Sequence, residues 1–205
     1  MTTDRISRQE ARRNAIIQAA RNCFREKGLH GTSMADIARE AQLGPGQIYR
    51  CFQNKDAIVE AIIKAIIGAR VEHMLAVNHD LVRKADEFTQ GLAGIAAFDS
   101  RDDALLLEIS AEATRNPRIA QLMVEADLDL FEQGCAMLKA RYPLLDETQV
   151  NALSEVMAVL TEGTLVRRHV RPHRPIDAQC LQSHYLAILH TLFPDSLRNN
   201  TSQKD

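Results

Sequence analysis

Hydrophobic residues recur every three or four positions along most of the chain, which is the spacing of helices that bury one face. The first such stripe, between residues 8 and 27, consists of Ile16, Ile17, Ala20, Cys23 and Phe24. No segment alternates hydrophobic and polar residues for long, so the pattern predicts no β-strand. The predicted fold class is therefore all-α.

Further helices are predicted over residues 55–77, 81–98, 101–115, 117–140, 146–169 and 177–193. Proline explains several of the breaks between them, because it lacks an N–H group and fits only the first turn of a helix. Pro117 begins one helix, whereas Pro143, Pro172 and Pro175 follow the ends of others. Residues 1–7 are predicted to be an irregular arm, and the polar residues 196–205 a disordered tail.

Two short helical patterns lie back to back in residues 32–55, which read TSMADIAREAQLGPGQIYRCFQNK. Ser33 is placed to cap the first helix, with Asp36 three residues later in a capping box. Pro45 is suited to the first turn of the second helix. That helix buries Ile48 and Phe52 and leaves the following side chains less committed to the interior: Gln47, Tyr49, Arg50 and Cys51. Two short helices joined by a tight turn are the layout of a helix-turn-helix that reads DNA.

This run resembles the DNA-binding domain of the TetR family of bacterial repressors. The residues that carry the resemblance are Thr32, Ser33, Ile37, Ala38, Ala41, Leu43, Gly46, Ile48, Tyr49, Phe52, Asn54, Lys55 and Asp56. Three positions depart from the family pattern: Gln42 replaces a turn glycine, Gly44 a Ser or Thr cap, and Cys51 a Tyr or His. A non-glycine residue with positive φ costs about 1 kcal/mol. The departures bear on the operator sequence, not on the fold.

The resemblance implies a three-helix, homeodomain-like helix-turn-helix domain over residues 1–54. A long helix would join it to a larger helical domain for ligand binding and dimerisation over residues 55–195. The implied DNA-binding residues are Thr32, Ser33, Met34, Pro45, Gly46, Gln47, Tyr49, Arg50, Cys51 and Lys55. Gln47 is the candidate for base readout, because its amide donates and accepts together against adenine. The residues expected to hold the DNA backbone are Ser33, Arg50 and Lys55.

Charge is unevenly distributed, although the whole chain has a formal net charge of only −2. Residues 1–55 contain ten Lys or Arg and five Asp or Glu, whereas the remaining 150 residues contain 15 basic and 22 acidic ones. A basic N-terminal segment on an otherwise acidic chain favours contact with DNA phosphates at the N-terminal end only. Near the start of the first helix, Arg8, Arg12 and Arg13 are either a solvated face or contacts to the DNA backbone.

The four cysteines, Cys23, Cys51, Cys135 and Cys180, form no C-x-x-C pair. Their spacing supports neither a zinc ribbon nor a disulfide framework, and it suits a reducing cytosol. The first helix begins with charged residues, not with a signal peptide, and the most apolar stretch is too short to span a bilayer. A cytoplasmic, bacterial location is therefore expected.

Enzyme and metal chemistry have little support in the sequence. His169 and His173 are four residues apart, but Pro172 breaks the helix that would align them. Glu108 and Glu112 share a helix face, yet a solvated acidic face or a carboxylate closing a ligand pocket explains them better than an acid–base pair. No nucleophile elbow, phosphate loop or dinucleotide fingerprint occurs. No catalytic residue, cofactor or metal is expected.

The identity of a small-molecule effector is not readable from the sequence. Aromatic residues make up only 4% of the chain and Trp is absent, so a cage for a flat cation is not favoured. Six residues are candidates to line an adaptable apolar pocket, although each also suits a plain core position: Met74, Phe88, Phe98, Met123, Phe131 and Met157. The resemblance to the TetR family implies an apolar or amphipathic effector, such as a toxin or an antimicrobial compound.

The last two predicted helices carry apolar residues that either close the core of one chain or pair with a second copy. These residues are Val150, Leu153, Val156, Met157, Leu160, Leu165, Cys180, Leu181, Tyr185, Ile188, Leu189 and Leu192. The resemblance implies a four-helix bundle between two subunits, and two-fold symmetry is what a helix-turn-helix needs to read a palindrome. A homodimer is therefore expected.

Together these observations predict a dimeric, ligand-responsive repressor that binds a palindromic operator in double-stranded DNA. The resemblance implies that a small molecule releases it by spreading the two DNA-binding domains, which requires that the ligand bind the spread state better than the DNA-competent state. Two alternatives remain open: a constitutive DNA-binding repressor without a ligand, and a helical enzyme with a cryptic site.

Overall fold

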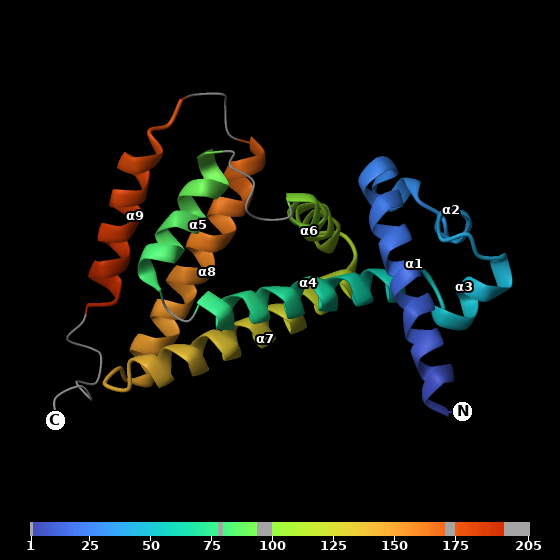
Figure 1. The fold of residues 1–205 in the computed structure, drawn as a ribbon, viewed down its shortest axis with the longest axis horizontal. Coiled ribbons are helices and arrows are strands. Elements are labelled where there is room, and N and C mark those ends of the chain that lie inside the picture. The colour runs from blue at the N-terminus through green and yellow to red at the C-terminus, as the bar shows by residue number, and fades with distance from the viewer. Residues whose placement is uncertain (1, 78–79, 94–99, 171–174, 195–205) are drawn as a thin grey trace. The chain divides into compact units, whose positions relative to one another are not determined.

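The computed structural model describes residues 2–77, 80–93, 100–170 and 175–194, and within them it contains nine helices and no strand (Figure 1). The helices are α1 (Thr2–Gly31), α2 (Met34–Glu40), α3 (Pro45–Cys51), α4 (Lys55–Val77), α5 (Leu81–Ala93), α6 (Ser100–Ala113), α7 (Pro117–Arg141), α8 (Glu147–Val170) and α9 (Ala178–Leu192). The predicted all-α fold class is confirmed. No helix among the described residues is both long and apolar enough to cross a membrane.

The predicted helix boundaries that fall on described residues agree with the structure to within a few residues, with one clear exception, and the predicted end at residue 98 lies outside them. The first helix begins at Thr2, so residues 2–7 are helical and do not form the irregular arm that was predicted. Pro117 does begin α7, whereas Pro172 lies outside the described residues. The predicted tail over residues 196–205 lies outside the described residues, as does Phe98.

Packing divides the chain into two compact units, one of Met1–Gly68 with Arg101–Ala126 and one of Ala69–Ser100 with Asp127–Asp205. The helices α4 and α7 each contribute residues to both units. This division follows contacts within the chain, whereas the predicted boundary at residue 54 separates functions. That boundary stays a prediction.

In the first unit, the core is built from branched aliphatic side chains on several helices. Those exposed by 2% or less include Ile16, Ile37, Ile48, Ile58, Ile62, Leu105, Ile109 and Ile119. Each fully buried side chain of this size contributes about 1.5–3 kcal/mol relative to an exposed one. The short helices α2 and α3 both pack on α1 and lie on the same side of it (Figure 1).

In the second unit, α5 packs against α8 and α9 around a separate hydrophobic cluster. Tyr142 stacks on Phe193 with ring centroids 5.4 Å apart, and Phe88 lies 5.2 Å from Tyr185. Most of the apolar residues predicted on α8 and α9 belong to this cluster: Val150, Leu153, Met157, Leu160, Tyr185, Leu189 and Leu192. Val150 and Leu189 are buried and close the core of the single chain, whereas the other five are partly buried against it.

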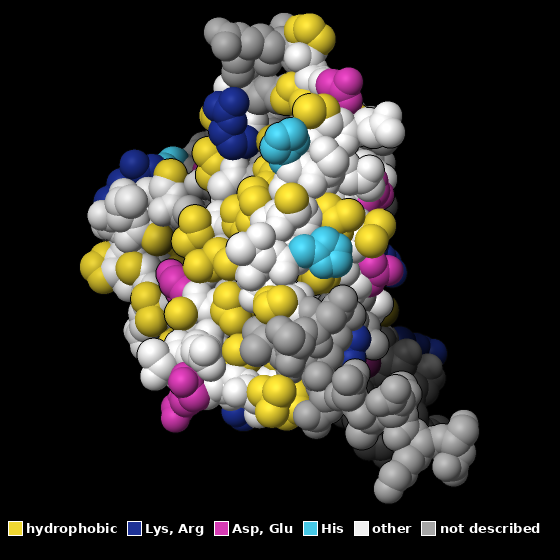
Figure 2. Space-filling view, turned by 90° about the vertical axis from the view of Figure 1, so that its left-hand side faces the viewer, with side chains coloured by type: hydrophobic (Ala, Val, Ile, Leu, Met, Phe, Trp, Pro, Cys, Tyr) yellow, Lys and Arg dark blue, Asp and Glu magenta, His cyan; other side chains and the backbone are white. Residues whose placement is uncertain are grey.

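A different set of apolar side chains on α8 and α9 is exposed. On α8 it forms a stripe with alternating spacings of three and four residues, which we name the α8 stripe: Val156, Val159, Gly163, Val166 and Val170. Ile188 of α9 is also exposed, by 45%. Seen from the α9 side, the middle of the molecular surface carries hydrophobic, polar and histidine side chains, and acidic ones lie toward its margins (Figure 2).

Candidate nucleic-acid interface

The N-terminus of α2 is fixed by the predicted capping box. The Asp36 N–H donates to Ser33 Oγ over 3.1 Å, and the Ser33 N–H donates to the Asp36 carboxylate over 3.0 Å. Hydrogen bonds from the Ser33 hydroxyl, the Lys27 ammonium and the Ser33 N–H hold the pKa of Asp36 well below its usual range. The carboxylate therefore stays ionised and keeps the cap closed at neutral pH.

The turn after α2 ends the helix in a Schellman motif. The Leu43 N–H donates to the Ala38 carbonyl over 2.8 Å, and the Gln42 N–H donates to the Arg39 carbonyl over 3.1 Å. This geometry requires a left-handed residue at position 42, and Gln42 has a φ of 55°. The strained non-glycine residue predicted at this position is therefore confirmed.

The N-cap of α3 is Gly44, which has no side chain to cap the helix. The Gln47 side chain takes over part of this role, because its Oε1 accepts a hydrogen bond from the Gly44 N–H over 3.1 Å. Gln47 is half-buried as a result. In the free chain the candidate base reader is therefore folded back onto its own helix.

The rest of α3 presents the predicted pattern of buried and exposed residues. Ile48 and Phe52 are 1% and 2% exposed, whereas Tyr49 is 58% exposed. A Cβ added to Gly46 would meet no atom within 4 Å, so nothing within the chain requires glycine there. Of the remaining predicted residues, Ser33 and Arg50 are exposed, Met34 and Cys51 are half-buried, and the side chain of Pro45 is not described.

Thr32 and Lys55 are both tied to the turn between α1 and α2. The Thr32 hydroxyl is buried and donates to the carbonyls of Cys23 and Gly28. The Lys55 ammonium donates to the Leu29 carbonyl over 2.6 Å and to the Thr32 carbonyl over 3.2 Å. Both side chains therefore stabilise this turn. The buried Thr32 hydroxyl is not exposed for contact with DNA, and the contact of Lys55 with a DNA phosphate stays a prediction.

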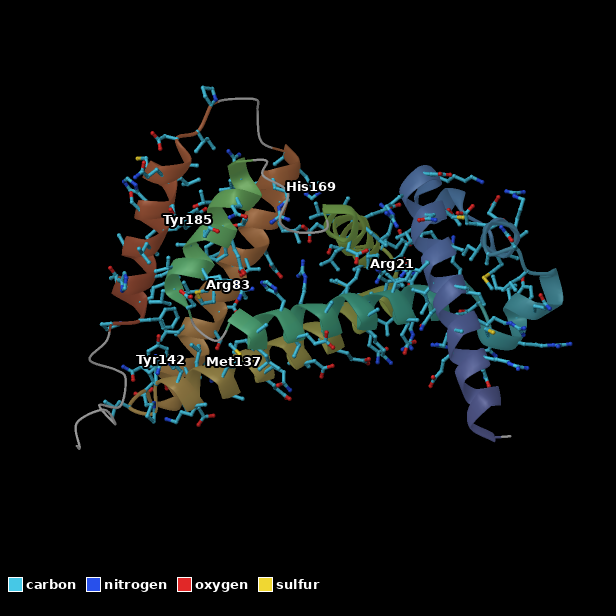
Figure 3. The ribbon with its side chains drawn as sticks, viewed as in Figure 1. Arg21, Arg83, Met137, Tyr142, His169 and Tyr185 are labelled. Carbon is cyan, nitrogen blue, oxygen red and sulfur yellow. The ribbon has the colours of Figure 1, made fainter. Side chains whose placement is uncertain are left out.

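The contact between α6 and the end of α1 was not predicted from the sequence. Arg21, on the side of α1 nearer α6, lies 2.9 Å from the Asp102 carboxylate (Figure 3). Gly28 interrupts α1 with φ 73° and ψ 167°, and the following Leu29 N–H donates to Glu108 Oε1 over 2.5 Å. Glu108 was expected to lie on a solvated acidic face or to close a ligand pocket. It binds the backbone of α1 instead.

Glu112 completes this contact between α6 and α1. Its Oε2 lies 2.7 Å from the His30 ring and accepts a hydrogen bond from Arg115 over 2.9 Å. Burial raises the pKa of the Glu112 carboxyl, but the hydrogen bonds from Arg115 and His30 lower it by more, so the net direction is downward. The carboxylate is therefore the stable form at neutral pH.

The candidate ligand-lining residues that the structure describes are divided between the two units. Phe88 and Met157 belong to the hydrophobic cluster of the second unit, in which Tyr185 and Tyr142 also lie (Figure 3). Met74 and Phe131 are half-buried in the same unit, whereas Met123 belongs to the first unit. Among the described residues, no group of three His, Cys, Asp or Glu side chains is placed to hold a metal ion.

Comparison with known proteins links this geometry to a family. A family model described as bacterial regulatory proteins, tetR family, matches residues 16–62. The HTH-type transcriptional regulator UidR of Escherichia coli (strain K12) is 33% identical over 125 residues. That match covers 58% of this chain and 61% of UidR, so the chain spans less than two thirds of this relative.

Solved structures extend the similarity to most of the chain. Salmonella enterica GusR superposes with a TM-score of 0.68 at 25% identity, over 89% of this chain and 95% of GusR. FadR from Bacillus subtilis in complex with stearoyl-CoA superposes with a TM-score of 0.64 at 20% identity, over 85% of this chain and 96% of FadR. The helix-turn-helix and the helical body thus occur together in these structures.

Proposed function

We propose that this chain, which belongs to the TetR family of bacterial regulatory proteins, is a repressor that binds a palindromic DNA operator as a homodimer. A small apolar or amphipathic effector would release it. The observation that carries the proposal is the exposed surface of α3, a seven-residue helix in which Ile48 is buried while Tyr49 and Arg50 face outward. The alternative of an enzyme is not carried further, because the relatives are named as transcriptional regulators.

In this proposal α3 enters the major groove, and Tyr49 and Arg50 contact the backbone or a thymine methyl. Gln47 reads a base after its Oε1 exchanges the Gly44 N–H for a partner in the groove. Gly46 supports close approach of the helix to DNA, since glycine costs up to about 1 kcal/mol in a helix and no contact within the chain explains it.

The α8 stripe supports association with a second copy of the chain. Its residues alternate at spacings of three and four, which is the pattern that packs two helices together in a coiled coil. A Cβ added to Gly163, at the centre of the stripe, would meet no atom within 4 Å, so a partner helix has room to approach closely. Two-fold pairing here would place two recognition helices on one palindrome.

Selection of random DNA duplexes by the purified protein tests the proposal. We expect enrichment of an inverted repeat with half-sites one or more helical turns apart, and an affinity that falls steeply with salt. No enrichment by a folded dimer would contradict DNA recognition. Val159→Lys should abolish the inverted repeat by breaking the α8 stripe, whereas Val124→Lys on α7 should not, although the two valines are about equally exposed at 59% and 60%.

Variants of α3 and its surroundings separate the assigned roles. Gln47→Ala should change the enriched sequence, whereas Lys55→Ala should weaken binding to all sequences alike. Because Lys55 also stabilises the α1–α2 turn, the thermal unfolding of this variant must be measured beside its affinity. Gly46→Ala should weaken DNA binding without lowering the melting temperature, and Gly68→Ala, also with open space around it, is the matched control.

The effector is tested by thermal unfolding and by release of DNA. The fold shared with a FadR structure that contains stearoyl-CoA makes stearoyl-CoA and stearate the first compounds to try. A ligand that binds the folded chain should raise its melting temperature by mass action and dissociate the operator complex. If no compound in a wider library does either, the chain represses constitutively.

A further inference from the structure

Arg13 of α1 reaches the C-terminal end of the recognition helix. Its Nη1 donates a hydrogen bond to the carbonyl of Cys51, the last residue of α3, over 3.3 Å. The guanidinium carbon lies 4.2 Å from the centroid of the Phe52 ring, which is 2% exposed. One side chain therefore contacts both the last residue of α3 and the residue that caps it.

The chemistry of a helix C-terminus explains why a cation is stabilising there. The last four carbonyls of a helix lack partners within the helix and carry the negative end of its dipole. A guanidinium is flat enough to stack on an aromatic ring while its N–H groups donate in the plane, which an ammonium cannot do. Arg13 meets both conditions, at Cys51 and at Phe52.

The direction of α3 depends on such contacts, because seven residues are too few for a helix to be stable alone. At its N-terminus the helix is tied by Gln47 to the Gly44 backbone, which is a contact within the same segment. At its C-terminus the tie to α1 is made by Arg13. Together with the burial of Ile48 and Phe52, this bond holds α3 against the rest of the first unit.

We propose that Arg13 is a positioning residue for DNA recognition: it sets the direction in which α3 presents Tyr49 and Arg50, and does not itself neutralise a phosphate. The inference rests on the proposed DNA-binding function. Neighbouring Arg12 is a matched comparison, since it carries the same charge, is exposed, and makes no hydrogen bond or ion pair with the described part of the chain.

Affinities for the selected operator and for an unrelated duplex, measured over a range of salt concentrations, distinguish positioning from phosphate contact. Arg13→Lys and Arg13→Gln should both lower the ratio of operator to unrelated affinity, on the order of tenfold, with the salt dependence unchanged. Arg12→Gln should leave that ratio unchanged. The proposal is overturned if Arg13→Gln reduces the salt slope by about one and weakens binding to both duplexes equally, while Arg13→Lys restores the affinity. Arg13 would then be a phosphate contact.

Hydrogen exchange of the full chain without DNA tests the positioning role independently. The Phe52 N–H, bonded to the Ile48 carbonyl over 2.9 Å, and the other α3 amides should exchange faster in Arg13→Lys and Arg13→Gln than in Arg12→Gln. Equal exchange in all three variants would overturn the proposal. If the unmodified chain selects no duplex at all, the proposed DNA-binding function fails, whereas the exchange result still decides whether Arg13 holds α3.

Discussion

Two neighbouring parts of the first unit are stabilised by hydrogen bonds of different range. The turn between α2 and α3 uses partners close in the sequence, and the contact between α1 and α6 uses partners far apart in the sequence. The turn uses hydrogen bonds between residues three to five positions apart, such as Gln42 with Arg39 and Leu43 with Ala38. The α6 contact uses carboxylates whose partners on α1 are 79 to 82 positions away. Local bonds leave a signature in the sequence, whereas distant ones depend on the packing of the whole unit.

The largest expected effect is at Gly28, where the two helices meet. Its φ of 73° and ψ of 167° lie in a region that only glycine adopts readily, and an added Cβ would lie 3.0 Å from Glu108 Oε1. Gly28→Ala should therefore lower the free energy of unfolding by about 2–3 kcal/mol in urea titrations. Gly31→Ala is the control, since its Cβ would make only an ordinary contact with Lys27. Equal stability of the two variants would contradict a fixed backbone at Gly28.

The next effect in size concerns the bond between Glu108 and the backbone of α1. Glu108→Ala leaves the Leu29 N–H without its acceptor, and we expect a loss of about 1–3 kcal/mol in the free energy of unfolding. Glu108→Gln keeps an oxygen at the same place and should recover most of that loss. If both variants lose the same amount, the charge and not the hydrogen bond holds α6 to α1.

The same contrast explains which parts of the site were readable from the sequence. The capping box at Ser33, the strained Gln42 and the exposed face of α3 follow from residues at short spacings, and all three occur in the structure. The partner of Glu108 could not be predicted, because the kink at Gly28 and the approach of α6 are tertiary features. The bonds of Lys55 to the Leu29 and Thr32 carbonyls could not be predicted either, because these partners lie 26 and 23 positions away in the sequence.

A smaller effect is expected within the local region. Ser33→Ala removes the acceptor of the Asp36 N–H, and typical caps of this kind contribute about 1 kcal/mol to the free energy of unfolding. Ser33→Thr retains a hydroxyl and should stay close to the unmodified protein. A full-sized loss in both variants would show that the Ser33 side chain acts through packing and not through the cap.

Acid should weaken the contact that Glu112 makes with α1. The pKa of the Glu112 carboxyl is lower in the folded chain, so its stabilising contribution is complete above the unfolded pKa of about 4.3 and is lost as pH falls through the folded value. The stability difference between the unmodified protein and Glu112→Gln should shrink as the pH falls below about 4. The effect is small because the His30 side chain is 69% exposed and water screens the pair. Glu132→Gln, at an exposed position of α7, should show no such trend.

The smallest effect is a gain in stability at Gln42. A left-handed φ costs an L-residue about 1–2 kcal/mol, but glycine loses about 0.4–1 kcal/mol more entropy on folding. Gln42→Gly should therefore raise the free energy of unfolding by only about 0.5 kcal/mol, and Gln42→Ala, which keeps a Cβ at the same φ of 55°, should not. A gain in both variants would place the strain in the exposed side chain and not in the backbone. A gain in Gln42→Gly alone would mean that this turn, although it is built from local bonds, retains strain at one residue that its own hydrogen bonds do not relieve.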